Sequence, residues 1–379
     1  MSTPSTATEI RPSLGELALV FLKLGTTAFG GPAAHIAMMH DEFARRRKWI
    51  SEEEFLDRLG AANLIPGPSS TEMAIHIGLL KRGWPGLLVA GACFIIPAAI
   101  LVGIIAAMYV RFGALPRVAG VLAAVKPVVI AIIAQAFWNL CKTAVKSPWL
   151  GVIGALSAAV YLLRAHELLI LLGAALLASV PRWSKRAKRT AILWVAAVPP
   201  VADGAVPVTL SRLFLTFLKI GSVLFGSGYV LLAFLRGDFV DRLHWLTQKQ
   251  LLDAVAVGQI TPGPVFTTAT FIGYIIAGTP GAAIATVAIF VPAFVLVAIS
   301  GPMVPRIRRS PIASAALDGV IVASLALMGV VAWQLGRDAI FNWQTAAIAL
   351  VSAALLLRWH VNSAWLILGS AALGALWKV

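Results

Sequence analysis

The stretch Leu64-Ile65-Pro66-Gly67-Pro68-Ser69-Ser70 decides the fold, because it has a counterpart in Ile260-Thr261-Pro262-Gly263-Pro264-Val265-Phe266. A shift of 196 residues aligns Phe21–Pro68 with Phe217–Pro264 without a gap, and 15 of these 48 positions are identical. The similarity predicts a duplicated chain, with one half in residues 1–189 and the other in residues 190–379. Repeats of this kind are typical of secondary transporters.

Composition places the chain in a membrane. Of its 379 residues, 59% are hydrophobic and only 12% are charged, and the mean hydropathy is +0.88. So few charges could not cover the surface of a soluble chain of this length. Apolar runs such as Gly86–Val110 and Val118–Leu140 are near the ~20 residues that cross a bilayer. The first dozen residues lack the features of a secretory signal, and we expect a multi-pass protein of the cell inner membrane.

The net charge of +15 argues for membrane orientation rather than for nucleic-acid binding, because Lys and Arg occupy the connections between apolar runs. Cys93 and Cys141 lie in or at the end of such runs, so we expect neither a disulfide nor a metal site. The histidines lack metal-ligand spacing, and no Gly-rich phosphate loop with a lysine occurs. We therefore expect no enzyme, no cofactor and no ATP-driven mechanism.

Five crossings are predicted in each half, and in the first half they lie near residues 16–39, 86–110, 118–140, 149–163 and 167–181. Between the first two, a capping box at Ser51 and Glu54 begins a short amphipathic helix that ends at Pro-Gly-Pro. A second short helix follows near residues 69–80, and Thr247 and Gln250 mark the equivalent box in the second half. Neither piece can span alone, so each half is expected to add a re-entrant helical hairpin.

The predicted fold class is an all-α polytopic membrane protein with about ten transmembrane helices, two re-entrant helical hairpins and an inverted repeat. With the N-terminus outside, the cytoplasmic face of the first half receives thirteen basic residues and the opposite face only Arg11, Arg111, Arg117 and Arg164. The thirteen are Arg45, Arg46, Arg47, Lys48, Lys81, Arg82, Lys142, Lys146, Arg182, Lys185, Arg186, Lys188 and Arg189. Because five crossings is an odd number, the second half must run inverted. The short apolar stretch 191–201 leaves this parity open.

The two Pro-Gly-Pro elements are predicted to bind an anion. Each begins a helix at membrane depth, where unpaired backbone N–H groups and the positive end of the helix dipole attract negative charge. The predicted binding residues here are Pro66, Gly67, Pro68, Ser69, Ser70, Thr71, Pro262, Gly263, Pro264, Thr267 and Thr268. The plainer interpretation is a tight turn with capping hydroxyls, but duplication of the element favours binding.

Lys23 and Lys219 lie near the middle of apolar stretches, where a lysine is costly and normally faces a cavity or a partner. The alternative is that the long side chains reach the membrane interface. Gly30 and Gly31, and Gly226 in the second half, follow within two turns. These glycines can break the helix and let the anion approach the backbone, or they can serve close helix packing.

Five further residues are candidates for coupling. Lys126 and Asp318 occupy equivalent positions in the two halves and are expected to form an ion pair, either structural or coupling, across the pseudo-two-fold axis. Glu72, His35 and His76 lie in or near the membrane and are candidates to carry a proton.

Four motifs occur in order along the first half. They are Phe21-Leu-Lys-Leu-Gly-x-x-Ala-Phe-Gly-Gly-Pro32-x-Ala-His35, Arg46-Arg-Lys-Trp49-Ile-Ser-Glu-Glu-x-Phe55, Leu64-Ile-Pro-Gly-Pro-Ser-Ser70 and Phe94-Ile-Ile-Pro97. Together they resemble the chromate ion transporter family in its full-length, two-domain form. The second half keeps the lysine and Pro-Gly-Pro elements but has Ser227-Gly228 in place of Gly31-Pro32.

The resemblance implies export of chromate from the cytoplasm and chromate resistance, with sulfate as the chemical analogue. Two alternatives remain open: uptake of sulfate or another oxyanion, and a non-transporting scaffold or intramembrane enzyme. The expected partners are a small oxyanion and the lipid bilayer, and a homodimer is one option for the assembly.

Overall fold

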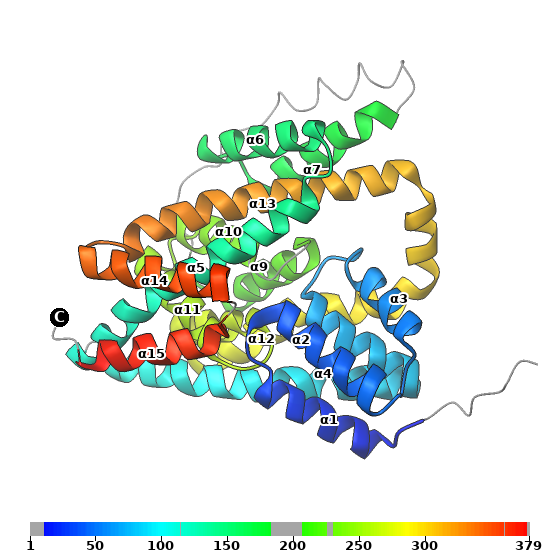
Figure 1. Cartoon of the computed structure of the whole chain (residues 1–379), viewed down its shortest axis with the longest axis horizontal. Helices are drawn as coiled ribbons and strands as arrows, with labels where there is room; N and C mark the ends of the chain where they lie inside the picture. The colour runs from blue at the N-terminus through cyan, green and yellow to red at the C-terminus, as the bar shows by residue number, and fades with distance from the viewer. Residues whose placement is uncertain (1–10, 114, 183–206, 226–229, 360, 377–379) are drawn as a thin grey trace, which may run out of the picture.

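The structure is a computed structural model that describes residues 11–113, 115–182, 207–225, 230–359 and 361–376. Within these ranges the ordered elements are helices, and no strand occurs (Figure 1). The first half contains α1 (Leu14–Thr27), α2 (Gly31–His40), the π-helical η1 (Asp41–Arg46), α3 (Glu52–Ala62), α4 (Ser69–Phe112), α5 (Pro116–Ala144), α6 (Pro148–Leu162), α7 (Glu167–Ser179) and η2 (Val180–Arg182).

The second half repeats this order. It contains α9 (Leu210–Val223), α10 (Leu231–Leu235), the π-helical η4 (Arg236–Arg242), α11 (Gln248–Ile260), η5 (Val265–Thr267), α12 (Thr268–Arg309), α13 (Pro311–Ala339), α14 (Trp343–Trp359) and α15 (Ser363–Leu376). The expected all-α fold with two homologous halves is therefore confirmed.

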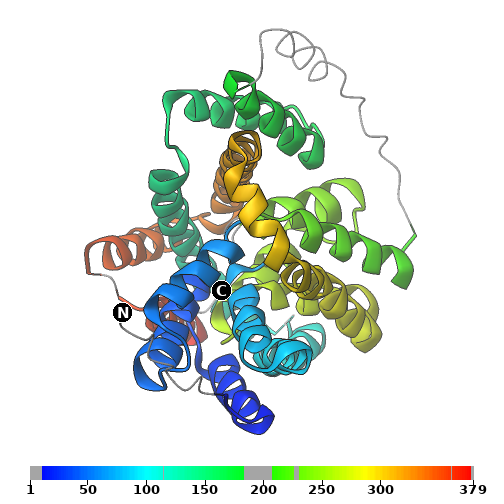
Figure 2. The same ribbon diagram turned by 90° about the vertical axis from the view of Figure 1, so that its right-hand side faces the viewer.

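Equivalent helices of the two halves make equivalent contacts. Helix α1 packs along α4 as α9 packs along α12, and α4 and α5 each pack against their own counterparts, α12 and α13. These two self-paired contacts form the centre of the molecule, with the other helices around them (Figure 2). An approximate two-fold axis therefore runs between α4 and α12 and between α5 and α13.

The terminal helix pairs are exchanged between the halves. Helices α6 and α7 of the first half pack on α13 of the second, while α14 and α15 pack on α5 of the first. In Figure 1, α6 and α7 lie above α13. Small residues allow the close approach: a side chain at Gly319 of α13 would collide with the Ala174 carbonyl of α7. The two halves are thus interwoven.

Four helical segments are long and apolar enough to cross a membrane: Ser69–Phe112, Val118–Ala144, Val265–Ile299 and Pro311–Ala339. Shorter apolar helices span Pro148–Leu162, Glu167–Ser179, Trp343–Trp359 and Ser363–Leu376. Helices α5, α6 and α7 confirm the helices expected near residues 118–140, 149–163 and 167–181. The total of ten crossings stays a prediction.

One expected helix boundary is wrong and another is confirmed. The single crossing at residues 16–39 is split into α1 and α2, because Gly30 (φ 100°) and Gly31 (φ 76°) adopt left-handed conformations just before Pro32. The break expected between residues 69–80 and 86–110 is confirmed, because α4 consists of two helical segments joined at Arg82 and Gly83, which leave helical geometry. Helix α12 bends at Ala277 and Gly278, the equivalent place.

Candidate functional site

The two Pro-Gly-Pro turns lie against the helix breaks of the opposite half. The Gly67 N–H donates to the Leu224 carbonyl, at 2.8 Å, where α9 has ended. The Gly263 N–H donates to the Ala28 carbonyl, at 2.9 Å, where α1 has ended. The turn of each half is therefore hydrogen-bonded to the helix break of the other half. The pseudo-two-fold axis relates these two contacts between the halves.

Both turns require glycine. Gly67 has a φ of 145° and Gly263 a φ of 86°, conformations that L-residues rarely adopt. A side chain at Gly67 would collide with the Glu72 carboxyl, and a Cβ at Gly263 would be 2.7 Å from Ala98 Cβ and 3.0 Å from the Gly25 carbonyl oxygen. The glycines allow the close backbone approach on which the two hydrogen-bonded contacts between the halves depend.

The first helix start gathers several of the predicted residues. Pro66 and Pro68 flank Gly67, Ser69 begins α4, and the Pro68 carbonyl accepts from the amides of Thr71 and Glu72.

His35 of α2 joins the helix break to this start. Its Nε2 lies 3.1 Å from the Ala28 carbonyl oxygen, and its Nδ1 lies 3.3 Å from Ser70 Oγ. Gly30 and Gly31 form the turn before α2 and so place His35 against α4.

At the second helix start the hydroxyls are turned toward the backbone. Thr267 Oγ1 donates to the Pro264 carbonyl and Thr268 Oγ1 to the Val265 carbonyl, each at 2.8 Å. Pro262 precedes Gly263 and lines a cavity. At the first start, by contrast, Thr71 Oγ1 is buried without a hydrogen-bond partner among the described residues. Gly226, the predicted counterpart of Gly30, lies outside the described residues.

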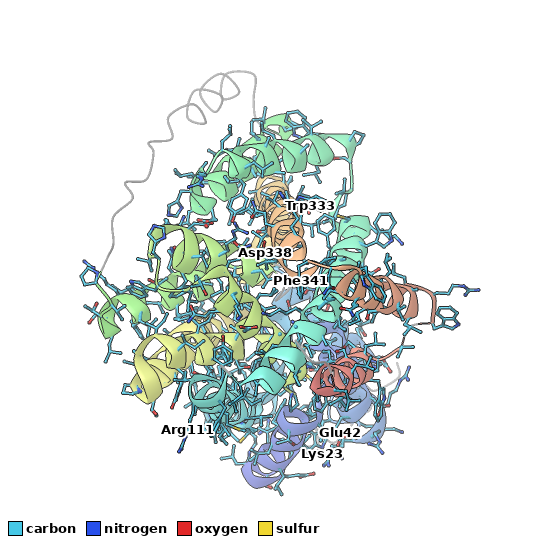
Figure 3. The ribbon with its side chains drawn as sticks, turned by 90° about the vertical axis from the view of Figure 1, so that its left-hand side faces the viewer. Lys23, Glu42, Arg111, Trp333, Asp338 and Phe341 are labelled. Atoms are coloured by element: carbon cyan, nitrogen blue, oxygen red, sulfur yellow. The ribbon has the colours of Figure 1, made fainter. Side chains whose placement is uncertain are left out.

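The two predicted lysines have different surroundings. Lys219 Nζ lies 2.5 Å from Asp238 Oδ1, and Asp238 also accepts from Arg242. Arg242 in turn binds Glu167 of α7, at 2.6 Å. Lys23 makes no ion pair among the described residues and is exposed beside Glu42, as Figure 3 shows.

Sequence reasoning missed the acids near these lysines and the arginines that bind those acids. The 196-residue shift pairs Glu42 with Asp238 and Arg46 with Arg242, and both pairs lie in the equivalent π-helical segments η1 and η4. That alignment, with one acid and one arginine four residues apart in each half, was the signal that could have found them. In the first half Arg47 donates to Glu42 at 2.7 Å, and this hydrogen bond lowers the pKa of Glu42.

The expected ion pair between Lys126 and Asp318 is wrong. Lys126 lies 2.7 Å from Asp253 of α11, which also accepts from the Tyr109 hydroxyl at 2.8 Å. Asp318 lies 2.7 Å from Lys146 instead. Equivalent positions in a repeat meet each other only on the two-fold axis, and these two residues lie away from it. Lys126 therefore binds an opposite charge on a neighbouring helix, and Asp318 binds one in the connection between α5 and α6.

A cavity of about 460 Å³ opens beside the second Pro-Gly-Pro turn. Thr27 and Phe29 of the first helix break line it, together with Thr261 and Pro262 at the turn and Trp365 of α15. The cavity is large enough for a small oxyanion, and most of its lining is apolar.

A second cavity, of about 330 Å³, lies next to the first, because Thr27 and Met38 line both. Its charged residues are Lys23, Asp41, Glu42 and Arg46. Lys23 therefore lines a cavity that adjoins the one beside the second Pro-Gly-Pro turn.

Known proteins resemble this chain along nearly its full length. The sequence profile described as "Chromate transporter" matches twice, at residues 15–179 and 211–375. A "Chromate transport protein" of Cupriavidus metallidurans is 35% identical over 95% of this chain and 92% of its own length.

Two further relatives carry similar names. A "Probable chromate transport protein" of Synechococcus elongatus is 34% identical over 82% of this chain and 81% of its own. A "Chromate transport protein" of Pseudomonas aeruginosa is 32% identical over 84% and 80%. No solved structure matches the fold significantly. The double match and the nearly full-length similarity lead to one conclusion: this multi-pass membrane protein belongs to the chromate transporter family.

Proposed function

We propose that this chain is a secondary transporter that exports chromate from the cytoplasm across the cell inner membrane and so confers chromate resistance. The observation that carries the proposal is that each Pro-Gly-Pro turn is hydrogen-bonded to the helix break of the opposite half. In a chain of this family, these contacts bring two helix starts and two helix breaks together. The names of three relatives support chromate as the substrate.

The chemistry of a dianion supports this site. A dianion that enters a membrane protein must replace its hydration shell with hydrogen-bond donors. A helix start offers such donors without a fixed counter-charge that would hold the ion too tightly. Lys23, beside the adjoining cavity, raises the local potential.

Not all of the expected donors are available in this conformation. The amides of Gly67 and Gly263 donate to carbonyls of the opposite half, and the Thr267 and Thr268 hydroxyls donate to backbone carbonyls. The Thr71 and Glu72 amides likewise donate to the Pro68 carbonyl. We propose that the anion binds chiefly at the first start, to the Ser70 amide and the Ser70 and Thr71 hydroxyls. The Thr71 hydroxyl, buried without a partner among the described residues, favours this half.

The membrane potential favours export. Moving one charge through ~100 mV is worth about 2.3 kcal/mol, so an inside-negative potential favours the exit of a dianion by about 4.6 kcal/mol. Chromate and sulfate are both tetrahedral dianions of similar size, and a site of N–H and O–H donors separates them poorly. Sulfate uptake is therefore the rival activity. A scaffold would have no need for duplicated helix breaks.

Flux measurements with the purified chain in proteoliposomes test the proposal. Labelled chromate and labelled sulfate should each be followed under imposed voltage and pH gradients. We expect protein-dependent loss of chromate that accelerates when the vesicle interior is negative. Protein-dependent movement of sulfate but not chromate would favour the rival activity, and no flux of either ion above that of empty vesicles would contradict transport of both.

A further inference from the structure

Glu72 is a buried carboxyl without a partner at the proposed anion site. It lies in the first turn of α4, its exposed fraction is 0%, and neither carboxyl oxygen has a hydrogen-bond partner among the described residues. The carboxyl is directed back at the Pro-Gly-Pro turn, since a side chain at Gly67 would collide with its Oε1.

Polar atoms next to Glu72 are also unsatisfied. Thr71 Oγ1 and His76 Nε2, both buried on the same helix, lack partners within the part of the chain that the structure describes. Buried polar groups are nearly always hydrogen-bonded, so several unpaired atoms within two turns need a functional explanation.

No neighbouring element supplies Glu72 with a counter-charge. Helices α1, α2, α3 and α11 pack against α4 and carry ionisable residues that include Lys23, His35, Asp57, Arg58 and Asp253, and α12 carries Tyr274. Among the described residues, none of them forms an ion pair or a hydrogen bond with Glu72. His35 instead contacts Ser70 and Ala28, and Asp253 binds Lys126 and Tyr109.

The second half has no equivalent carboxyl. The 196-residue shift aligns Glu72 with Thr268, whose hydroxyl donates to the Val265 carbonyl. Because packing of the equivalent turn does not require a carboxyl there, the glutamate has a role that belongs to the first half alone.

We propose that Glu72 is a proton-binding site that is occupied together with the anion, so that the transporter binds a dianion and a proton cooperatively. The inference rests on the proposed anion site at the first Pro-Gly-Pro turn. A carboxylate here would be an unpaired buried charge, and it would also repel a dianion bound to the same helix start. The protonated carboxyl removes both penalties.

The proposal fixes the sign of a pH effect. If the anion binds best when Glu72 carries its proton, then anion binding must strengthen proton binding by the same factor. Anion affinity is then highest at low pH and falls as the pH rises and Glu72 loses its proton. The same linkage requires that anion binding at higher pH takes up a proton from the solution.

Sulfate is the suitable probe, because it keeps both charges in this pH range, whereas chromate takes up a proton itself. Sulfate affinity of the full chain in lipid nanodiscs should be measured by calorimetry from about pH 5 to about pH 8. We expect binding to weaken about tenfold or more over this range, within the usual size of a coupling between sites. The variant Glu72→Gln, which mimics the protonated form, should bind sulfate tightly and with little pH dependence.

Two controls assign the effect. Glu53→Gln, which removes an exposed carboxyl in the first turn of α3, should keep the wild-type pH dependence. Proton uptake on sulfate binding, obtained from calorimetry in two buffers of different ionisation enthalpy, tests the wild-type chain without any substitution.

The possible outcomes are distinct. Sulfate binding by the wild type that is independent of pH and takes up no proton would overturn this proposal and leave the anion site standing. So would a Glu72→Gln variant that keeps the wild-type pH dependence. Failure of the wild type to bind either sulfate or chromate at any pH would instead overturn the proposed function on which the inference rests.

Discussion

Lys23 and Lys219 occupy equivalent positions but have different tasks in this conformation. Lys219 belongs to a chain of charges that continues through Asp238 and Arg242 to Glu167 on α7. Lys23 lines a cavity and has no ion-pair partner among the described residues. After small gaps, Arg164-x-His166 aligns with Arg358-x-His360 and Glu167 with Val361, so the first half cannot form the same chain. One lysine therefore joins helices, while the other can attract an anion.

This difference predicts separable effects of Lys23→Gln and Lys219→Gln. Both variants should express and lower chromate flux, by about tenfold where roughly 1.4 kcal/mol of favourable charge interaction is lost. Only Lys219→Gln should also lower the free energy of unfolding, by about 1–3 kcal/mol, because it removes a partner from the buried Asp238. Thermal unfolding and proteoliposome flux measure the two effects.

Lys249→Gln, at an exposed position in the first turn of α11, is the matched control and should leave flux and stability unchanged. Wild-type flux in both variants would return the lysines to the role of interfacial anchors.

At the residue scale, the sequence predicted positions better than partners. The cost of a lysine in an apolar stretch identified Lys23 and Lys219, and the repeat made them a pair. The partner of Lys126 could not be predicted, because which helix of which half lies opposite it depends on the exchanged packing. Asp253 binds Lys126, whereas its repeat equivalent Asp57 is exposed.

The helical hairpins at Pro-Gly-Pro are the elements that the sequence predicted best. Thr247 and Gln250 form the expected capping box of α11, and Ser51 caps α3 by accepting from the Glu54 amide. The two helical segments of α4 were also predicted, as a short helix near residues 69–80 and an apolar run from residue 86, and they meet at Arg82 and Gly83. The contact of each turn with the opposite half could not be predicted from the sequence. Gly67 and Leu224, which form one of these hydrogen bonds, are 157 residues apart, and no local pattern encodes such a contact.

Because each Pro-Gly-Pro turn is hydrogen-bonded to the opposite helix break, Gly67→Val and Gly263→Val should each weaken anion binding strongly. Valine cannot adopt either backbone conformation without strain, and it would meet Glu72 at one turn and Ala98 at the other. Each change should displace its turn from the opposite helix break. We expect at least tenfold weaker chromate binding, about 1.4 kcal/mol or more, by equilibrium binding to the purified variants.

Gly369→Val is the matched control for these two variants. No atom lies within 4 Å of a Cβ at that position of α15, so chromate affinity should stay at the wild-type value. The site assignment would be refuted by normal chromate binding in both turn variants.

At the scale of the whole molecule, the duplication was readable from the sequence but the exchange of helix pairs was not. The repeat shows that α5 and α13 are equivalent, yet it does not say which copy of the terminal helices covers each one. In the structure each is covered by the pair from the other half. We continue to propose a boundary between the two repeats near residue 189. This boundary separates the repeats in the sequence, but the two repeats are not separate bodies in the structure.

The molecule also departs from two-fold symmetry. Helix α11 packs against α5, and Lys126 and Asp253 join the two. Their counterparts α3 and α13 do not pack together in this way among the described residues. The contact between α11 and α5 thus contains a buried ion pair, and among the described residues no such pair joins α3 to α13.

Inverted topology is the remaining prediction at this scale, and it follows from the odd number of crossings and the thirteen-to-four division of basic residues in the first half. Arg45 and Asp241 test it well, because the 196-residue shift makes them equivalent and both side chains are well exposed, by 67% and 47%. Arg45→Cys and Asp241→Cys should be placed separately in a chain whose Cys93 and Cys141 are replaced by alanine. An impermeant thiol reagent applied to intact cells should label position 241 and spare position 45 until the cells are opened.

The arginines around position 45 favour the cytoplasm, whereas the equivalent segment near position 241 carries balanced charge. Labelling of both positions from the same side would mean that the halves run parallel, and the crossing count of five per half would then be wrong.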